Sequence, residues 1–169
     1  MTTPRRLTPA DAPAFAALRR AAIVESPWAF LGAPGDDSGS DASVIAERIA
    51  NPENVIVAID HESDASRLVA VAGVFRMPRL KQRHRAGIWG VYCEPEFRGR
   101  GYGRAVVGAA VEVARSWPGV KIVGLAVSSR SPRVRAMYES LGFVYWGTEP
   151  DTIEIDGQCA DDDYLCLRL

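Results

Sequence analysis

Two helices are predicted in the first third of the chain by apolar residues that recur every three or four positions. The first runs from about residue 8 to residue 24, and the second is capped by Asp41 or Ser43. A short extended segment at residues 5–7 precedes both. The glycine- and aspartate-rich stretch between the helices, residues 32–40, is typical of a flexible loop.

Three strands are predicted in the middle of the chain. Apolar, β-branched runs at residues 55–59 and 68–75 predict two strands joined by a polar turn. The arginine-rich segment 76–85 predicts a hairpin turn that leads into a third strand at residues 86–93. Because the net charge of the chain is close to neutral, this basic segment favours a solvated hairpin over a nucleic-acid-binding patch.

The third strand begins a predicted strand–helix–strand unit at the centre of the chain. A glycine-dense turn follows it, then a helix over residues 104–115 and a strand over Val120–Val127. This last strand is apolar apart from Lys121, as expected when both of its faces are covered. The wide apolar surface of the helix indicates burial beneath the sheet. Such a parallel crossover is almost always right-handed.

The C-terminal part predicts one more helix and two strands. The helix begins at Pro132 with Ser131 as its N-cap, and Gly142 ends it in left-handed geometry. Strands follow at residues 143–148 and 164–169. The resulting order (β, α, α, β, β, β, α, β, α, β, β) indicates a single α/β domain that spans residues 1–169.

Composition and charge narrow the classes of function. With 169 residues, 47% of them hydrophobic and 24% charged, the chain resembles an ordinary soluble domain. The net charge of −1 argues against nucleic acid or an anionic membrane as a partner. No apolar stretch approaches the length of a membrane span, and the N-terminal residues lack the apolar core of a signal peptide.

The cysteines indicate a reducing compartment. Cys93, Cys159 and Cys166 are odd in number and form no Cys-x-x-Cys pair, so neither a disulfide framework nor a zinc site is implied. We therefore expect a cytoplasmic protein that holds no metal.

The turn Arg98-Gly99-Arg100-Gly101-Tyr102-Gly103 joins a predicted strand to a predicted helix. Glycines let backbone amides approach a ligand closely, and the first amides of a helix have no intrahelical acceptor, which together suit a phosphate. A P-loop is excluded because no Lys-Ser or Lys-Thr pair is present. A dinucleotide fingerprint is excluded because the third glycine comes one residue too soon and residues 120–127 contain no acid. The turn predicts a pyrophosphate cradle of another kind.

Two motifs in this region resemble one family. Arg98-x-x-Gly101-x-Gly103 resembles the Arg/Gln-x-x-Gly-x-Gly/Ala signature for acetyl-CoA in the GNAT N-acetyltransferase superfamily. The segment 131–143 is similar to its second motif, Asn-x-x-Ala-x-x-Leu-Tyr-x-x-x-Gly-Phe. The tyrosine, glycine and phenylalanine positions match at Tyr138, Gly142 and Phe143. The segment departs from the motif at Ser131, Val134 and Met137.

This resemblance covers nearly the whole chain and implies both fold and activity. The fold implied is a mixed central β-sheet with helices on both faces around a central βαβ unit. The activity implied is transfer of an acetyl group from acetyl-CoA directly to a primary amine of a small molecule or peptide. The cofactor-binding residues that we expect are Val91, Tyr92, Cys93, Arg98, Gly99, Arg100, Gly101, Tyr102, Gly103, Arg104 and Ser131.

These residues have different expected roles. The resemblance implies that the backbone of Val91, Tyr92 and Cys93 pairs with the pantetheine arm, and an amide there is a candidate donor to the thioester oxygen. The alternative for this segment is plain β-core. The three arginines of the turn are expected to meet the phosphates, although a solvated surface is an equal alternative for Arg100. Cys93 is not expected to act as a nucleophile, because no partner histidine is evident.

Tyr138 is the candidate general acid. A phenol with a pKa of about 10 can return a proton to a departing thiolate, whose conjugate acid has a pKa of about 8.5. The alternative is core packing, because Val134, Met137, Tyr138 and Leu141 form a helical stripe. No general base is identifiable: Glu25, Glu94 and Glu96 have the character of surface carboxylates, and a chain of water molecules could serve instead.

Other functions and assemblies remain open at this point. The chain could be a non-catalytic acyl-CoA-binding or sensing module on the same fold, or a nucleotide-phosphate-binding protein that uses the glycine turn alone. Asp36, Asp37 and Asp41, together with Glu25, could attract a cationic amine, although a solvated linker is the simpler interpretation. A homodimer also remains open.

Overall fold

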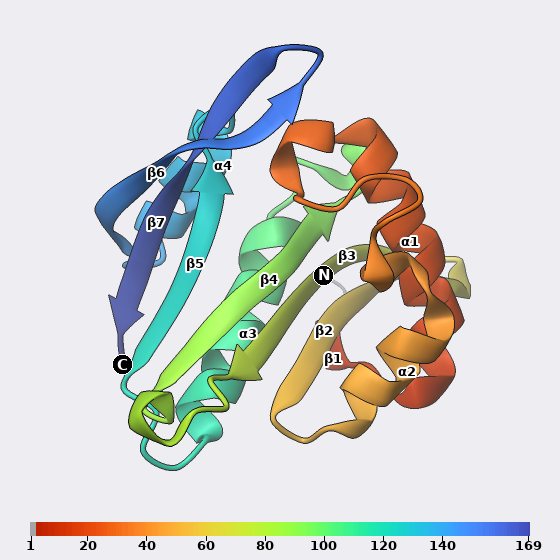
Figure 1. Ribbon diagram of the computed structural model, residues 1–169. Helices are drawn as coiled ribbons and strands as arrows, with labels where there is room; N and C mark the ends of the chain where they lie inside the picture. The colour runs from red at the N-terminus through yellow and green to blue at the C-terminus, as the bar shows by residue number, and fades with distance from the viewer. Residues whose placement is uncertain (1–2) are drawn as a thin grey trace.

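The computed structural model describes residues 3–169 (Figure 1) and confirms the predicted order of elements. The strands and helices are β1 (Arg5–Arg6), α1 (Ala12–Glu25), α2 (Ala42–Ala50), β2 (Asn54–His61), β3 (Asp64–Arg76), β4 (Arg85–Cys93), α3 (Tyr102–Ser116), β5 (Ile122–Ser128), α4 (Pro132–Glu139), β6 (Val144–Ile155) and β7 (Gln158–Arg168). Short 3₁₀ turns, including one at Pro27–Ala29, lie between them.

A single mixed sheet organises the described residues. Its seven strands lie in the order β1-β2-β3-β4-β5-β7-β6, and only β4 and β5 pair in parallel. Helices α1 and α2 pack on one face of this sheet, and α3 packs on the other (Figure 1). The predicted mixed sheet with helices on both faces is therefore confirmed.

Helix α3 supplies the core on its face of the sheet. Its apolar stripe, with Val106, Val107 and Ala110 completely buried, packs on inward-facing residues of β2, β3 and β5. The helix begins at Tyr102, two residues before the predicted start at residue 104, because Gly101 takes the N-cap position with a φ of +83°. The last two residues of the glycine turn, Tyr102 and Gly103, therefore already belong to α3.

The opposite face is covered by the two N-terminal helices. Phe15 of α1 and Ile45 of α2 are almost completely buried against β2 and β3. Asp41, rather than Ser43, caps α2, because its carboxylate accepts hydrogen bonds from the backbone N–H groups of Ser43 and Val44 at 2.8 and 3.5 Å. Both helices stand on the half of the sheet formed by β2 and β3.

Strands β4 and β5 create the opening that positions the site. They pair only at their first residues, from Arg85 opposite Ile122 to Gly87 opposite Gly124. Beyond that point β4 stays with β3 and β5 stays with β7, so the two strands diverge (Figure 1). The strand edge of β4 beyond Gly87 is therefore left without a partner on the β5 side.

A bulge in β4 accentuates this divergence. Val71 lies opposite Tyr92, but two residues further along β3 Gly73 lies opposite Trp89, so β4 contains one additional residue. Gly90 lies within this bulge with a φ of +62°, a left-handed conformation that favours glycine.

Candidate active site

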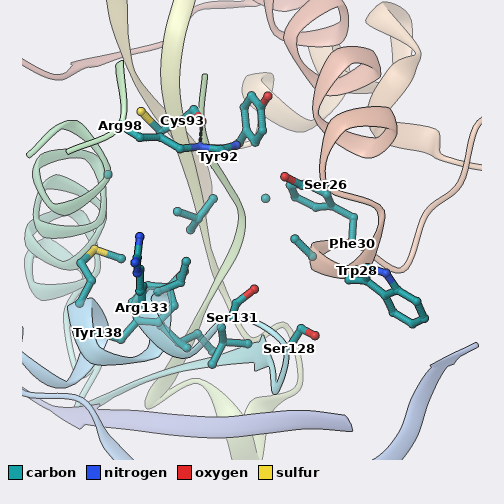
Figure 2. A pocket seen from close by; sticks show the side chains of 18 of the residues that line it. Ser26, Trp28, Phe30, Tyr92, Cys93, Arg98, Ser128, Ser131, Arg133 and Tyr138 are labelled. Atoms are coloured by element: carbon teal, nitrogen blue, oxygen red, sulfur yellow. Dashed lines mark hydrogen bonds between the residues drawn. The ribbon is translucent and has the colours of Figure 1, made fainter. Parts of the chain in front are cut away.

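A cavity of about 880 Å³ fills the cleft between the diverging strands (Figure 2). Four segments and one helix contribute to its lining: residues 25–30, residues 88–93 of β4, residues 97–104, residues 125–131 and, from α4, residues 133, 134, 137 and 138. Figure 2 places Tyr138 and Arg133 on the α4 side, facing Ser26, Phe30 and Trp28 across the cavity. The cavity therefore joins parts of the chain that are more than one hundred residues apart.

The structure brings together the residues expected to bind the cofactor, with one exception. All of them line the cavity except Arg100. The guanidinium carbon of Arg100 lies 5.3 Å from the ring centroid of Phe97, and the side chain is exposed. Its position fits the alternative of a solvated surface residue rather than a direct role at a phosphate.

The glycine turn forms one end of the cavity. Gly99 and Gly101 have φ values of +75° and +83°, which a residue with a side chain adopts only with strain. A Cβ added at Gly99, Gly101 or Gly103 would meet no atom within 4 Å. Because the first amides of α3 lack intrahelical acceptors, this open space faces unsatisfied N–H donors and the positive end of the helix dipole. A phosphate fits this geometry.

Two arginines flank the turn and hold different partners. Arg104, in the first turn of α3, donates to Ser140 Oγ at 2.5 Å and to the Ser140 carbonyl oxygen at 3.3 Å. Arg98 donates through Nε to the carbonyl oxygen of Cys93 at 2.9 Å. Its other nitrogens reach the carboxylate of Glu25 at 3.1 and 2.6 Å. Arg98 therefore links the glycine turn to both β4 and the end of α1.

The edge of β4 forms a second wall of backbone groups. The Glu94 N–H donates to the carbonyl oxygen of Val69 in β3 at 2.9 Å. Since successive residues of a strand point their polar groups to opposite sides, the N–H and C=O of Cys93 face the cleft. The hydrogen bond from Arg98 to the Cys93 oxygen is consistent with this orientation. The edge thus offers the hydrogen-bonding pattern that an extended ligand requires.

Tyr138 lies between the cavity and the core. Its side chain is 4% exposed, lines the cavity and packs edge-to-face on Phe143, with 5.9 Å between ring centroids. Burial raises the pKa of the phenol, so the hydroxyl keeps its proton at neutral pH. The other members of the predicted stripe are less buried: Val134 is 39% exposed, and Met137 and Leu141 are partly exposed.

Ser131 precedes α4 as predicted, but its hydroxyl does not cap the helix. No side-chain hydrogen bond is made at this N-cap position. The residue lines the cavity, and Figure 2 shows its hydroxyl turned toward it. The hydroxyl is therefore turned to the cavity rather than to the helix.

The sequence offered two interpretations of Glu25: a surface carboxylate, or one of the acids that attract a cationic amine. The residue lines the cavity, where its carboxylate also accepts from Ser26 Oγ at 2.5 Å and Tyr92 Oη at 3.3 Å. The hydrogen bonds from Arg98 are the largest cause of its lowered pKa, so the group is ionised at neutral pH. It is the one carboxylate among the described residues that line the cavity.

The pairing of Glu25 with Arg98 could not be recognised from the sequence because the two residues are distant along the chain. Arg98 lies 73 positions further along the chain, and nothing in the local pattern at the end of α1 connects the two residues. The other two glutamates that were considered do not line the cavity. Glu94 pairs instead with Arg67 at 2.6 Å, and Glu96 is exposed.

The acidic loop has a structural role. Asp37 forms an ion pair with Arg19 at 2.8 Å, with side chains only 8% and 12% exposed, and it also accepts from Ser40 Oγ. Asp36 accepts from the backbone N–H of Ala33, and Asp41 caps α2. None of these three acids lines the cavity. Their carboxylates fix the segment between α1 and α2, which the sequence had suggested to be flexible.

Cys93 has the properties of an inert thiol. It is partly buried, and burial is the largest cause of the raised pKa of its Sγ. A thiol with a raised pKa carries little thiolate at neutral pH, and the thiolate is the nucleophilic form. This agrees with the expectation that Cys93 is not a nucleophile.

The structure describes residues 3–169. This part of the chain contains no group of three or more His, Cys, Asp or Glu residues placed to hold a metal ion. Within the same residues, no helix combines the length and the apolarity needed to cross a bilayer.

Comparisons with known proteins extend these observations. The sequence profile described as the acetyltransferase (GNAT) family matches residues 20–143. No curated protein matches the sequence. Many solved structures match the fold, and three of them illustrate its range.

Each of the three covers nearly all of this chain. The ribosomal-protein-alanine N-acetyltransferase from Brucella melitensis is 21% identical, with a TM-score of 0.82 over 98% of this chain and 99% of that one. The acetyltransferase yncA from Salmonella typhimurium, solved with acetyl-CoA, is 18% identical, with a TM-score of 0.84 over 100% and 94%. A phosphinothricin acetyltransferase from Sinorhizobium meliloti, in complex with acetyl-CoA, is 19% identical, with a TM-score of 0.81 over 99% and 88%.

At these identities the solved structures establish a shared fold. The family profile establishes membership, because it covers most of the chain and contains both motifs around Gly101 and Tyr138. The resemblance seen in the sequence is thus confirmed. The chain belongs to the GNAT acetyltransferase family.

Proposed function

We propose that this acetyltransferase takes its acetyl group from acetyl-CoA and transfers it directly to a primary amine. One observation carries the proposal: the open glycine turn, the unpaired edge of β4 and the Tyr138 side chain all border the same cavity. Two of the solved structures that share the fold contain acetyl-CoA, which supports the choice of donor.

The glycine turn and the edge of β4 would hold the two ends of the donor. The amides of residues 101–104 would bind the pyrophosphate, and each such bond to a charged oxygen contributes about 1.5–3 kcal/mol. Arg104 would add positive charge beside them. The backbone N–H and C=O groups of Cys93, and those of Val91 in the bulge, would pair with the pantetheine arm as a neighbouring strand does, whereas the backbone groups of Tyr92 face Val71 of β3. Ser131 would contribute a hydroxyl from the opposite wall.

The bulge in β4 would stabilise charge on the thioester oxygen. Gly90 and Val91 fall in the register shift, where the regular ladder to β3 is interrupted. An amide released from the ladder can donate to a developing oxyanion, a contribution that is often the largest single part of catalysis. The backbone, rather than any side chain, performs this step.

Tyr138 would protonate the departing thiolate of coenzyme A. The raised pKa of its phenol keeps the proton on the hydroxyl at neutral pH, and it also makes this phenol a weaker acid than a free tyrosine. The pKa of an ordinary thiol is lower, so the transfer assists departure rather than driving it alone. The inert character of Cys93 supports direct transfer without an acyl-enzyme.

Glu25 would meet the acceptor at the other end of the cavity. Its ionised carboxylate can attract a protonated amine. The lowered pKa makes it a weak proton acceptor, so we assign it to binding and leave the loss of the amine proton to water.

The cellular setting is also a proposal. All three cysteines are free, as is usual in a reducing compartment, and this supports a cytoplasmic enzyme.

The proposed function is tested in two stages. Calorimetry should show that coenzyme A binds in preference to ATP and NAD. A panel of primary amines incubated with acetyl-CoA should then release free thiol with at least one amine. Preference for ATP or NAD would remove the assigned donor, and binding of coenzyme A without thiol release from any amine would favour a binding module.

A further inference from the structure

Three distant segments meet at the acceptor end of the cavity. The guanidinium carbon of Arg130 lies 3.8 Å from the ring centroid of Trp28, so the two side chains stack. Arg130 also donates to the carbonyl oxygen of Cys159 at 3.0 Å and to Gln158 Oε1 at 3.4 Å. We call the contact of Trp28, Arg130 and the Cys159 carbonyl the clasp.

The clasp is anchored on each of its three sides. Trp28 lies in the 3₁₀ turn at Pro27–Ala29, directly after α1. The loop that carries Arg130 is joined to β7 through the N–H of Ser129, which donates to the carbonyl oxygen of Asp161 at 2.8 Å. Cys159 belongs to the first residues of β7, at the end of the β6–β7 hairpin. Figure 1 shows this hairpin and the segment after α1 at the same end of the molecule.

The position of the clasp bears on the size of the acceptor that can bind in the cavity. Both Trp28 and Arg130 line the cavity. Figure 2 shows Trp28 on the side of the cavity away from Arg98. A free amine that fits between Glu25 and Tyr138 ends inside the cavity. The stacked pair and its hydrogen bond to Cys159 bridge residues 26–30 and the β6–β7 hairpin, so a polypeptide acceptor that extends from the cavity on this side meets the pair.

We propose that the clasp makes this enzyme selective for small free amines and excludes amines that continue into a polypeptide. The inference rests on the proposed function and adds the size class of the acceptor together with two specificity-determining residues. Trp28 and Arg130 act on the acceptor only, because neither borders the glycine turn or the edge of β4.

The test uses conjugates that bind whether or not they react. Coenzyme A is joined through its sulfur and an acetyl bridge to the amine of alaninamide, or to the N-terminal amine of an alanine tetrapeptide amide. Calorimetry compares the two affinities for the wild type and for Trp28→Ala and Arg130→Ala. We expect the wild type to bind the short conjugate at least about tenfold more tightly, and each variant to reduce this ratio to about threefold or less.

Matched controls separate the clasp from a general effect of the substitutions. Trp146 is 61% exposed on β6 and Arg115 pairs only with Glu112 on α3, and neither residue lines the cavity. Trp146→Ala and Arg115→Ala should keep the wild-type ratio. The affinity for free coenzyme A should be the same in all five proteins.

The other possible results contradict either the inference about the clasp or the proposed function. Equal affinity of the wild type for both conjugates overturns the inference, and so does a ratio that the two clasp variants leave unchanged. Binding of free coenzyme A with rejection of both conjugates overturns the inference but keeps the assigned donor. Failure to bind free coenzyme A overturns the proposed function first, and the inference with it.

Discussion

The two ends of the cavity are built in different ways. The end proposed to bind the cofactor consists mainly of backbone: the glycine turn at residues 98–104 and the edge of β4 at residues 88–93. The acceptor end consists of side chains from separate segments, with Glu25 held by Arg98 and Trp28 held by Arg130. A backbone site depends on local conformation, whereas a side-chain site depends on tertiary contacts. The first kind is suited to a donor common to a family, and the second to an acceptor that differs between its members.

If the cofactor end is a backbone site, a side chain in the glycine turn should produce the largest effect. Gly101→Val places a β-branched residue at a φ of +83° and fills the open space in front of the amides. We expect coenzyme A to bind about thirtyfold more weakly, or ~2 kcal/mol, by calorimetry. Gly108→Val on the same helix, where an added Cβ also meets nothing, serves as the control. Equal affinities for the two variants would place the donor elsewhere.

The segment next to the acceptor end is also held by tertiary contacts, because Arg19 stacks on Phe30 of the cavity wall and pairs with Asp37 outside it. Removing this ion pair should destabilise the segment. Asp37→Asn leaves Arg19 without its carboxylate partner at a position where both side chains are nearly buried. We expect a loss of about 1–3 kcal/mol, seen as a fall in melting temperature of several degrees. Asp36→Asn removes a neighbouring charge that accepts only a backbone hydrogen bond, and it should change the melting temperature less. A similar small change for both variants would mean that the loop is held in another way.

The same contrast explains what could be predicted from the sequence. The glycine turn, the strand before it and the helix after it are adjacent in sequence, so Gly99 and Gly101 could be assigned before their positive φ values were known. The ion pair of Asp37 with Arg19 spans 18 positions, and that of Glu25 with Arg98 spans 73. No local periodicity encodes such pairs. The ion pairs that hold Glu25 and the acidic loop were therefore missed.

The C-terminal hairpin shows a second limit of local patterns. Only residues 143–148 and 164–169 were predicted as strands, but β6 extends to Ile155 and β7 begins at Gln158. The missed residues include many acids, among them Asp161 to Asp163, and β-propensity scales disfavour aspartate. Pairing along the whole hairpin, and Asp163 meeting Arg135 at 2.7 Å, outweigh that local preference. The Cys159 part of the clasp could not be foreseen for this reason.

Substitution of Tyr138 tests whether this residue of α4 has a catalytic role or only packs in the core. Tyr138→Phe keeps the ring against Phe143 and removes the proton and the hydroxyl. We expect kcat to fall at least about tenfold, or ~1.4 kcal/mol, while the affinity for acetyl-CoA and the melting temperature change little. Tyr145→Phe, on the exposed face of β6, should leave kcat unchanged. Wild-type activity in Tyr138→Phe, or a loss of activity that follows a loss of stability, would return the residue to the core.

Substitution of Glu25 has the smallest expected effect on kinetics. It also separates the two ends of the cavity most sharply, because the KM of only one substrate should change. Glu25→Gln removes the charge that faces the acceptor but keeps the size of the side chain and its contact with Arg98. We expect the KM for an amine identified in the panel to rise about fivefold, or ~1 kcal/mol, with the KM for acetyl-CoA unchanged. Glu94→Gln, whose side chain pairs with Arg67 outside the cavity, is the matched control.

The pH dependence distinguishes a charge effect from a change of shape at Glu25. Because Arg98 lowers the pKa of Glu25 below its ordinary value, the carboxylate keeps its charge as the pH falls from about 8 to about 5 and loses it only below its own pKa. The ratio of KM between Glu25→Gln and wild type should therefore stay constant over that range. A ratio that declines between about pH 8 and pH 6 would assign the titrating group to another residue. An increase in the KM for acetyl-CoA would mean that Glu25 acts through Arg98 on the cofactor end, so the two ends would not be independent.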